Sequence, residues 1–136
     1  MPVIPHTPSP SPSATPLPPT ATPVPHNAVA TARAPTYDAP ALRSAMEHML
    51  DSLGGFADLV KSQSRVGIKA NLTGGTWWDT PDKPPATELF VTHPAVVGAL
   101  CELLIDAGAG RLVVMDGLGD ETSFDAWGYT DMAARL

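Results

Sequence analysis

The chain has 136 residues, and 8 Lys and Arg against 14 Asp and Glu give it a formal net charge of −6. This length is enough for one small domain, and the acidic balance argues against non-specific nucleic-acid binding. The single cysteine, Cys101, cannot form an internal disulfide or hold an iron–sulfur cluster or a structural zinc alone, and no run of 18 apolar residues predicts a transmembrane helix.

Residues 1–26 are rich in Pro, Ser, Thr and Ala, and ten of the chain's 16 prolines lie there. Proline favours polyproline II, and the few large apolar side chains cannot offset the entropy of ordering. We therefore expect a disordered linker, typical of stalks that hold an exported domain away from a membrane or wall. This favours an extracytoplasmic location, although Met1–Pro5 does not resemble a signal peptide. A PxxP ligand and a cytoplasmic location are the alternatives.

Two elements are expected before residue 55. Residues 27–33 (NAVATAR) are expected to form a first strand of small residues. Asp38 is expected to cap a helix with Pro40 in its first turn, and the glycines at 54–55 end it. The apolar stripe of this helix is Leu42, Ala45, Met46, Met49, Leu50 and Leu53.

The segment Arg65–Leu72 (RVGIKANL) organises the rest of the chain. Its apolar residues recur with a period of two, which predicts a strand, at Val66, Ile68, Ala70 and Leu72. Lys69 and Asn71 then share the other face, at the carboxyl end where open α/β sheets bind ligands. They could offer a positive charge and an amide to an anion. The alternative is a solvated lysine and a turn-capping asparagine.

Residues 73–91 form an unusually long connection that contains Trp77 and Trp78. The tryptophans indicate either a lid over a ligand or a flap that covers the edge of the sheet. Next, Thr92 or His93 is expected to cap a helix that begins with Pro94. The free amides at a helix start attract anions, and His93 could donate to such a ligand or simply cap.

Residues 111–116 (RLVVMD) predict a second strand. A strand–helix–strand run of this length forms a right-handed parallel unit, so Asp116 should end at the same edge as Lys69 and Asn71. There Asp116 could bind a metal or a hydroxyl. The following GLGDE lacks the third glycine of a dinucleotide-binding fingerprint. Residues 130–136 look like the start of a helix, so we expect a truncated domain with bare sheet edges.

These motifs resemble those of the family known as domain of unknown function 362. The matching residues are Lys69, Asn71, Leu72, Thr92, His93, Pro94, Ala107, Gly108, Asp116 and Gly117. Gly128 and Tyr129 are similar to the start of the family's next helix. The resemblance covers about residues 28–136, the amino-terminal part of the family domain. The resemblance implies a fold and site residues but no substrate, because the family has no settled activity.

The chain departs from the family pattern in two ways. Ala70 stands where the family has a proline, which loosens the turn after the lysine. Many relatives have a ferredoxin-like cysteine cluster, whereas this chain has Cys101 alone, so no iron–sulfur cluster is expected within it.

We therefore predict an α/β, partial Rossmann-like three-layer domain over residues 27–136. Its carboxyl edge is expected to bind a small anionic molecule through Lys69, Asn71, Thr92 and His93, with a possible divalent metal at Asp116. Whether the site is enzymatic stays open. The alternatives are a non-catalytic extracytoplasmic interaction module on the Pro-rich stalk, or a non-functional fragment.

Overall fold

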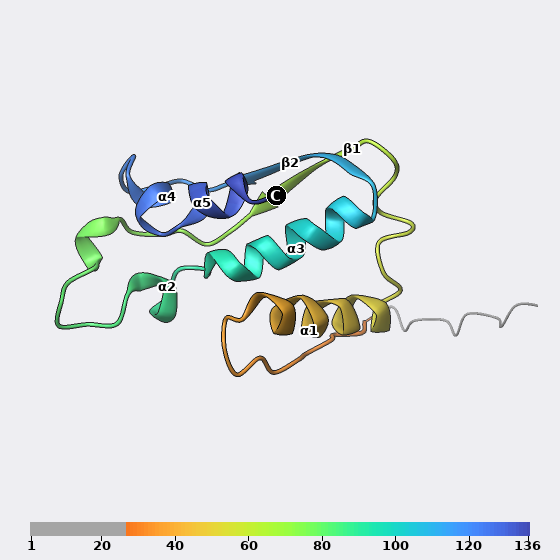
Figure 1. Cartoon of the computed structure of the whole chain (residues 1–136), viewed down its shortest axis with the longest axis horizontal. Coiled ribbons are helices and arrows are strands. Elements are labelled where there is room, and N and C mark those ends of the chain that lie inside the picture. The colour runs from red at the N-terminus through yellow and green to blue at the C-terminus, as the bar shows by residue number, and fades with distance from the viewer. Residues whose placement is uncertain (1–26) are drawn as a thin grey trace, which may run out of the picture.

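The computed structural model describes residues 27–136, so the expected disorder of residues 1–26 lies outside the described part. The element order is mixed helix and strand, which confirms the α/β class (Figure 1). The elements are α1 (Ala39–Ser52), β1 (Ser64–Lys69), the 3-10 helix η1 (Thr76–Trp78), α2 (Ala86–Leu89), α3 (Pro94–Asp106), β2 (Ala109–Met115), α4 (Ser123–Ala126) and α5 (Tyr129–Ala134).

The strands β1 and β2 are parallel neighbours, with Val66 beside Leu112 and Ile68 beside Val114. The helix α3 connects them, which confirms the predicted strand–helix–strand unit. Both strands run with their carboxyl ends together, so the residues that follow Lys69 and Met115 meet at one edge.

The expected strand at residues 27–33 is wrong. These residues form no strand, and all of them except Ala30 are exposed. Short side chains such as these bury little apolar surface, so the segment gains too little from packing against the sheet to offset its ordering.

The helices cover one face of the sheet. In Figure 1, α3 lies beneath the strands and α1 lies beyond α3, which gives layers in the order sheet, α3, α1. Val66 and Ile68 of β1 and Leu112 and Val114 of β2 point into the core between the sheet and the helices. The buried cluster comprises Val60, Ile68, Ala70, Leu72, Ala86, Val91, Val97, Cys101, Leu104, Trp127, Tyr129 and Met132.

Local signals fix the helix ends as the sequence indicates. The carboxylate of Asp38 accepts from the backbone nitrogen of Ala41 at 3.2 Å, and α1 begins there. Gly108 follows α3 with φ 98°, a left-handed conformation that glycine adopts without steric cost. Arg43 of α1 forms ion pairs with Glu102, at 3.3 Å, and with Asp106 of α3.

The opposite face of the sheet is exposed. We call it the open face, and its residues are Arg65, Gly67 and Lys69 of β1 and Arg111, Val113 and Met115 of β2. Arg65 and Arg111 are register partners, so two like charges lie side by side on neighbouring strands. Like charges at directly paired positions destabilise a sheet.

We expect Arg111→Glu to raise the free energy of unfolding by roughly 0.2–1 kcal/mol, because it replaces this repulsion with a cross-strand attraction. Urea unfolding at low and high salt measures the change, which added salt should reduce. The control is Arg33→Glu, an equal charge change in the exposed segment before α1. Equal stability of the two variants would contradict the expectation.

Candidate functional site

Lys69 and Asp116 meet at the carboxyl edge of the sheet. The Lys69 Nζ atom lies 2.6 Å from Asp116 Oδ1 and also donates to the Ala70 carbonyl at 2.6 Å. The side chain of Lys69 is 65% exposed, whereas that of Asp116 is 9% exposed. The parallel arrangement thus brings Lys69 and Asp116 into a direct ion pair at the carboxyl edge of the sheet.

The carboxylate of Asp116 joins the ends of both strands. Beyond Lys69, it accepts from the backbone nitrogen of Leu72 and from that of Gly117, the latter at 2.7 Å. The hydrogen bond from Lys69 and those from Leu72 and Gly117 lower the pKa of Asp116. Asp116 is therefore ionised at neutral pH, with both of its oxygens engaged.

Asn71 links the end of β1 to the segment before α3. Its backbone nitrogen donates to Thr92 Oγ1 at 3.1 Å, and its carbonyl accepts from the Thr92 nitrogen at 2.9 Å. The side-chain nitrogen of Asn71 donates to the Phe90 carbonyl at 2.8 Å. Asn71 and Thr92 are thus brought together as expected, mainly through contacts that shape the backbone.

His93 caps α3 with its own side chain. Its Nδ1 accepts from the backbone nitrogen of Ala95 at 3.1 Å, and its ring stacks on Tyr37 with centroids 3.7 Å apart. Burial lowers the pKa of His93, which favours the neutral ring that this cap requires. Pro94 has no amide hydrogen, and Val96 donates to the His93 carbonyl. The amides at the helix start are therefore already engaged, so an anion would need the free side of the imidazole.

Tyr129 is a buried neighbour of this edge that the sequence patterns did not single out as a site residue. Its hydroxyl donates to the Thr92 carbonyl at 2.7 Å, and the residue is 1% exposed. Burial, with a smaller contribution from the negative charge of Asp116, raises the pKa of Tyr129 to about 12. The phenol stays protonated and holds α5 against the start of α3.

Two further aspartates position the long connection, and sequence reasoning missed both. Asp79 accepts from the Ala86 nitrogen and from the Trp127 indole nitrogen, each at 2.7 Å. Asp120 accepts from the nitrogen and hydroxyl of Thr76, at 2.7 and 3.0 Å.

Asp120 also organises its own turn. It accepts from the nitrogen and hydroxyl of Thr122, at 3.0 and 2.9 Å, and from the Ser123 hydroxyl at 2.8 Å. These hydrogen bonds, led by the one from the Thr76 nitrogen, hold the pKa of Asp120 well below its usual range. Aspartate side chains commonly accept from the backbone nitrogen two residues on, so this pattern could have predicted the contact between Asp120 and the Thr122 nitrogen.

The two exposed tryptophans lie on η1 within the long connection. Trp77 is 60% exposed and Trp78 is 50% exposed, and Trp78 makes an edge contact with Phe90 at 5.9 Å between centroids. The ring of Trp77 crosses close to the backbone at Gly75 and Gly119. This packing is compatible with a lid and equally with a covering flap, and the expected ligand platform stays a prediction.

A separate cavity of about 510 Å³ lies between α3, β2 and α5. Cys101, Leu112 and Tyr129 are among its mainly apolar lining, and neither Lys69 nor Asp116 contributes to it.

Within residues 27–136, no three His, Cys, Asp or Glu side chains gather closely enough to hold a metal by themselves. In the same range, the structure contains no helix with the length and hydropathy needed to span a bilayer.

A family model described as Domain of unknown function (DUF362) matches residues 66–136, just over half of the chain. The chain belongs to this family. The match begins in β1 and includes Lys69, Asn71, the start of α3 and Asp116, so the DUF362 model covers every expected site residue.

The curated relative Thylakoid-associated protein sll1697 from Synechocystis sp. is 33% identical over 96 residues. This alignment covers 71% of the chain and 26% of the relative, so the chain spans about a quarter of that protein's length. No solved structure matches the chain.

We expect Gly119→Ala to destabilise the DUF362 domain by roughly 1–3 kcal/mol, the usual cost of overpacking. A Cβ at Gly119 would lie 2.0 Å from the Gly74 carbonyl oxygen and 2.4 Å from the Trp77 ring. Gly117→Ala is the matched control, since a Cβ there meets nothing within 4 Å. Thermal unfolding of both variants measures the difference, and equal midpoints would contradict the packing described here.

Acid unfolding should report the role of Asp116. A lowered folded pKa stabilises the fold above the ordinary aspartate pKa of about 3.9, and this stabilisation is lost as the pH falls through the folded value. We expect Asp116→Asn to have a lower free energy of unfolding than the wild type at pH 7. This difference in free energy should become smaller below about pH 4. Urea unfolding across this pH range measures it, with exposed Asp58→Asn as the control. A gap that does not change with pH would contradict the assignment.

Proposed function

We propose that the carboxyl edge of the sheet binds a small anionic molecule together with a divalent cation, between Lys69 and Asp116. The observation that carries this proposal is the ion pair of 2.6 Å between an exposed lysine and a mostly buried aspartate at that edge. Ligands of open α/β sheets bind in this position.

The ion pair suggests how the ligand would enter. Two contacts hold the Lys69 ammonium, one to Asp116 and one to the Ala70 carbonyl, and the long side chain is mostly in solvent. A cation would take the place of the ammonium on Asp116 Oδ1, and the released Lys69 would bind the accompanying anion. The site would exchange one pair of opposite charges for two, so no uncompensated charge would remain.

Magnesium fits this edge better than zinc. The carboxylate paired with Lys69 is that of Asp116, and residues 27–136 contain no group of three His, Cys, Asp or Glu that could hold a metal ion. Magnesium keeps several waters and is commonly bound by one or two carboxylates with phosphate oxygens, whereas zinc sites use three or four protein ligands. A phosphate-like anion would complete the magnesium shell and meet Lys69.

The other expected ligand residues keep unused hydrogen-bonding capacity. Thr92 Oγ1 accepts from Asn71, which leaves its hydroxyl hydrogen for an anion. The neutral His93 ring uses Nδ1 as an acceptor, so its Nε2 carries the hydrogen and can donate. We propose Asn71, Thr92 and His93 as secondary contacts around the anion.

We also propose that the domain functions outside the cytoplasm, close to a membrane. The Pro-rich composition of residues 1–26 supports this location, and the Synechocystis relative is named as thylakoid-associated. Fractionation of the native protein tests it, and recovery with cytoplasmic markers alone would contradict it.

Calorimetric titration of inorganic phosphate, with and without magnesium, tests the anion site. We expect binding only with magnesium, and a loss of about tenfold or more in affinity for Lys69→Ala, because a charge-assisted hydrogen bond is removed. Lys61→Ala is the control, since Lys61 precedes the opposite end of β1. Circular dichroism confirms folding of each variant. Magnesium-independent binding, or equal binding by the wild type and Lys69→Ala, would overturn the proposal.

A further inference from the structure

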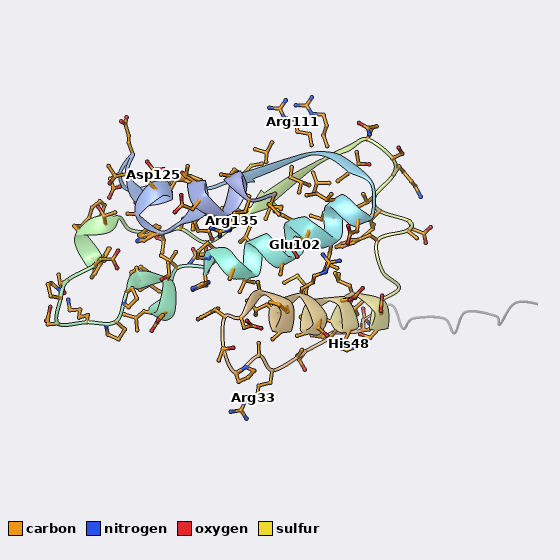
Figure 2. The ribbon with its side chains drawn as sticks, viewed as in Figure 1. Arg33, His48, Glu102, Arg111, Asp125 and Arg135 are labelled. Carbon is orange, nitrogen blue, oxygen red and sulfur yellow. The ribbon has the colours of Figure 1, made fainter. Side chains whose placement is uncertain are left out.

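The open face of the sheet combines apolar and basic side chains. The exposed fractions of Val113 and Met115 are 39% and 47%. The side chain of Met115 lies across Gly67, where a Cβ would be 2.7 Å from its terminal methyl. Figure 2 shows Arg111 on the side of the sheet that faces away from α3. An apolar strip thus runs beside a pair of arginines.

Parallel sheets are almost always covered on both faces, because their connections place helices there. In residues 27–136, α3 covers one face, and the open face has no helix against it. A helix is about 10–12 Å wide with its side chains, and neighbouring strands are about 4.8 Å apart. One helix is therefore wide enough to cover this pair of strands.

The charge on the open face specifies what kind of helix fits. Arg65 and Arg111 are register partners, and the ion pairs formed within residues 27–136 use Arg43 and Lys69 instead. Two adjacent guanidinium groups repel each other, and each can bind a carboxylate through two parallel hydrogen bonds. A negatively charged partner would replace this repulsion with attraction, at a basic site in a chain whose net charge is −6.

We propose that the open face docks an amphipathic α-helix of a partner polypeptide. Its apolar side chains lie on Val113 and Met115, and its Asp or Glu side chains pair with Arg65 and Arg111. An anionic lipid surface fits less well, because the whole acidic domain would be repelled by it. A single helix meets only the local positive field. Lys69 lies on the same face, as the register partner of Met115, and the helix contacts proposed here do not use it.

The test uses a fluorescent 18-residue helical peptide made of Leu, Ala and Glu, with Leu on one face and Glu along its borders. A matched peptide has Lys in place of every Glu. Fluorescence anisotropy with the full chain should show binding of the Glu peptide only. The double variant Arg65→Glu/Arg111→Glu should weaken that binding by at least about tenfold, since two charge-assisted contacts are lost.

Controls separate this docking from general charge effects and from misfolding. Arg33→Glu/Lys83→Glu changes the net charge equally at exposed positions away from the sheet and should bind like the wild type. The variant Arg65→Gln/Arg111→Gln, with its fold checked by circular dichroism, removes the positive charges without adding negative ones. It should also weaken binding of the Glu peptide. No binding of the Glu peptide, or equal binding by the wild type and both arginine variants, would overturn the proposal. So would arginine-dependent binding to phosphatidylglycerol vesicles in place of the peptide, which would assign the face to a membrane.

Discussion

The carboxylate of Asp116 is the contact on which the candidate site depends. It is nearly buried, and it bonds the backbone after β1, the backbone after β2 and the ammonium of Lys69. A buried carboxylate needs such partners, because an unpaired charge is costly away from water. The same contacts bring the ends of the two strands together. The feature that stabilises the junction is thus also the feature that a ligand would have to rearrange.

The rest of the edge follows the same pattern, in which acidic side chains hold loops in place. Asp79 joins the long connection to Trp127, and Asp120 joins η1 to the turn before α4. These aspartates contribute to the net charge of −6, yet their oxygens are occupied by donors from the chain itself. The side chain of Lys69 is by contrast largely in solvent.

The sequence predicted much of this fold because its signals are local. The alternation in β1, the caps at Asp38 and His93, and the handedness of strand–helix–strand units place Lys69 and Asp116 at one edge, as found. The direct ion pair was not predicted, because spacing indicates proximity and does not determine contact. The contact of Asp79 with Trp127 and that of Asp120 with Thr76 were missed because these partners lie 48 and 44 residues away along the chain. The strand at residues 27–33 was wrong because small side chains give a weak pattern.

The single thiol of the chain has a consequence for how its motions can be observed. Cys101 lies on the inner side of α3, where it is 1% exposed, and burial raises its pKa. Alkylating reagents react with the thiolate, so the folded molecule protects this sulfur both by access and by protonation. The rate at which a reagent modifies Cys101 therefore reports how often the interior of the domain opens. This native cysteine allows local opening to be measured without an introduced label.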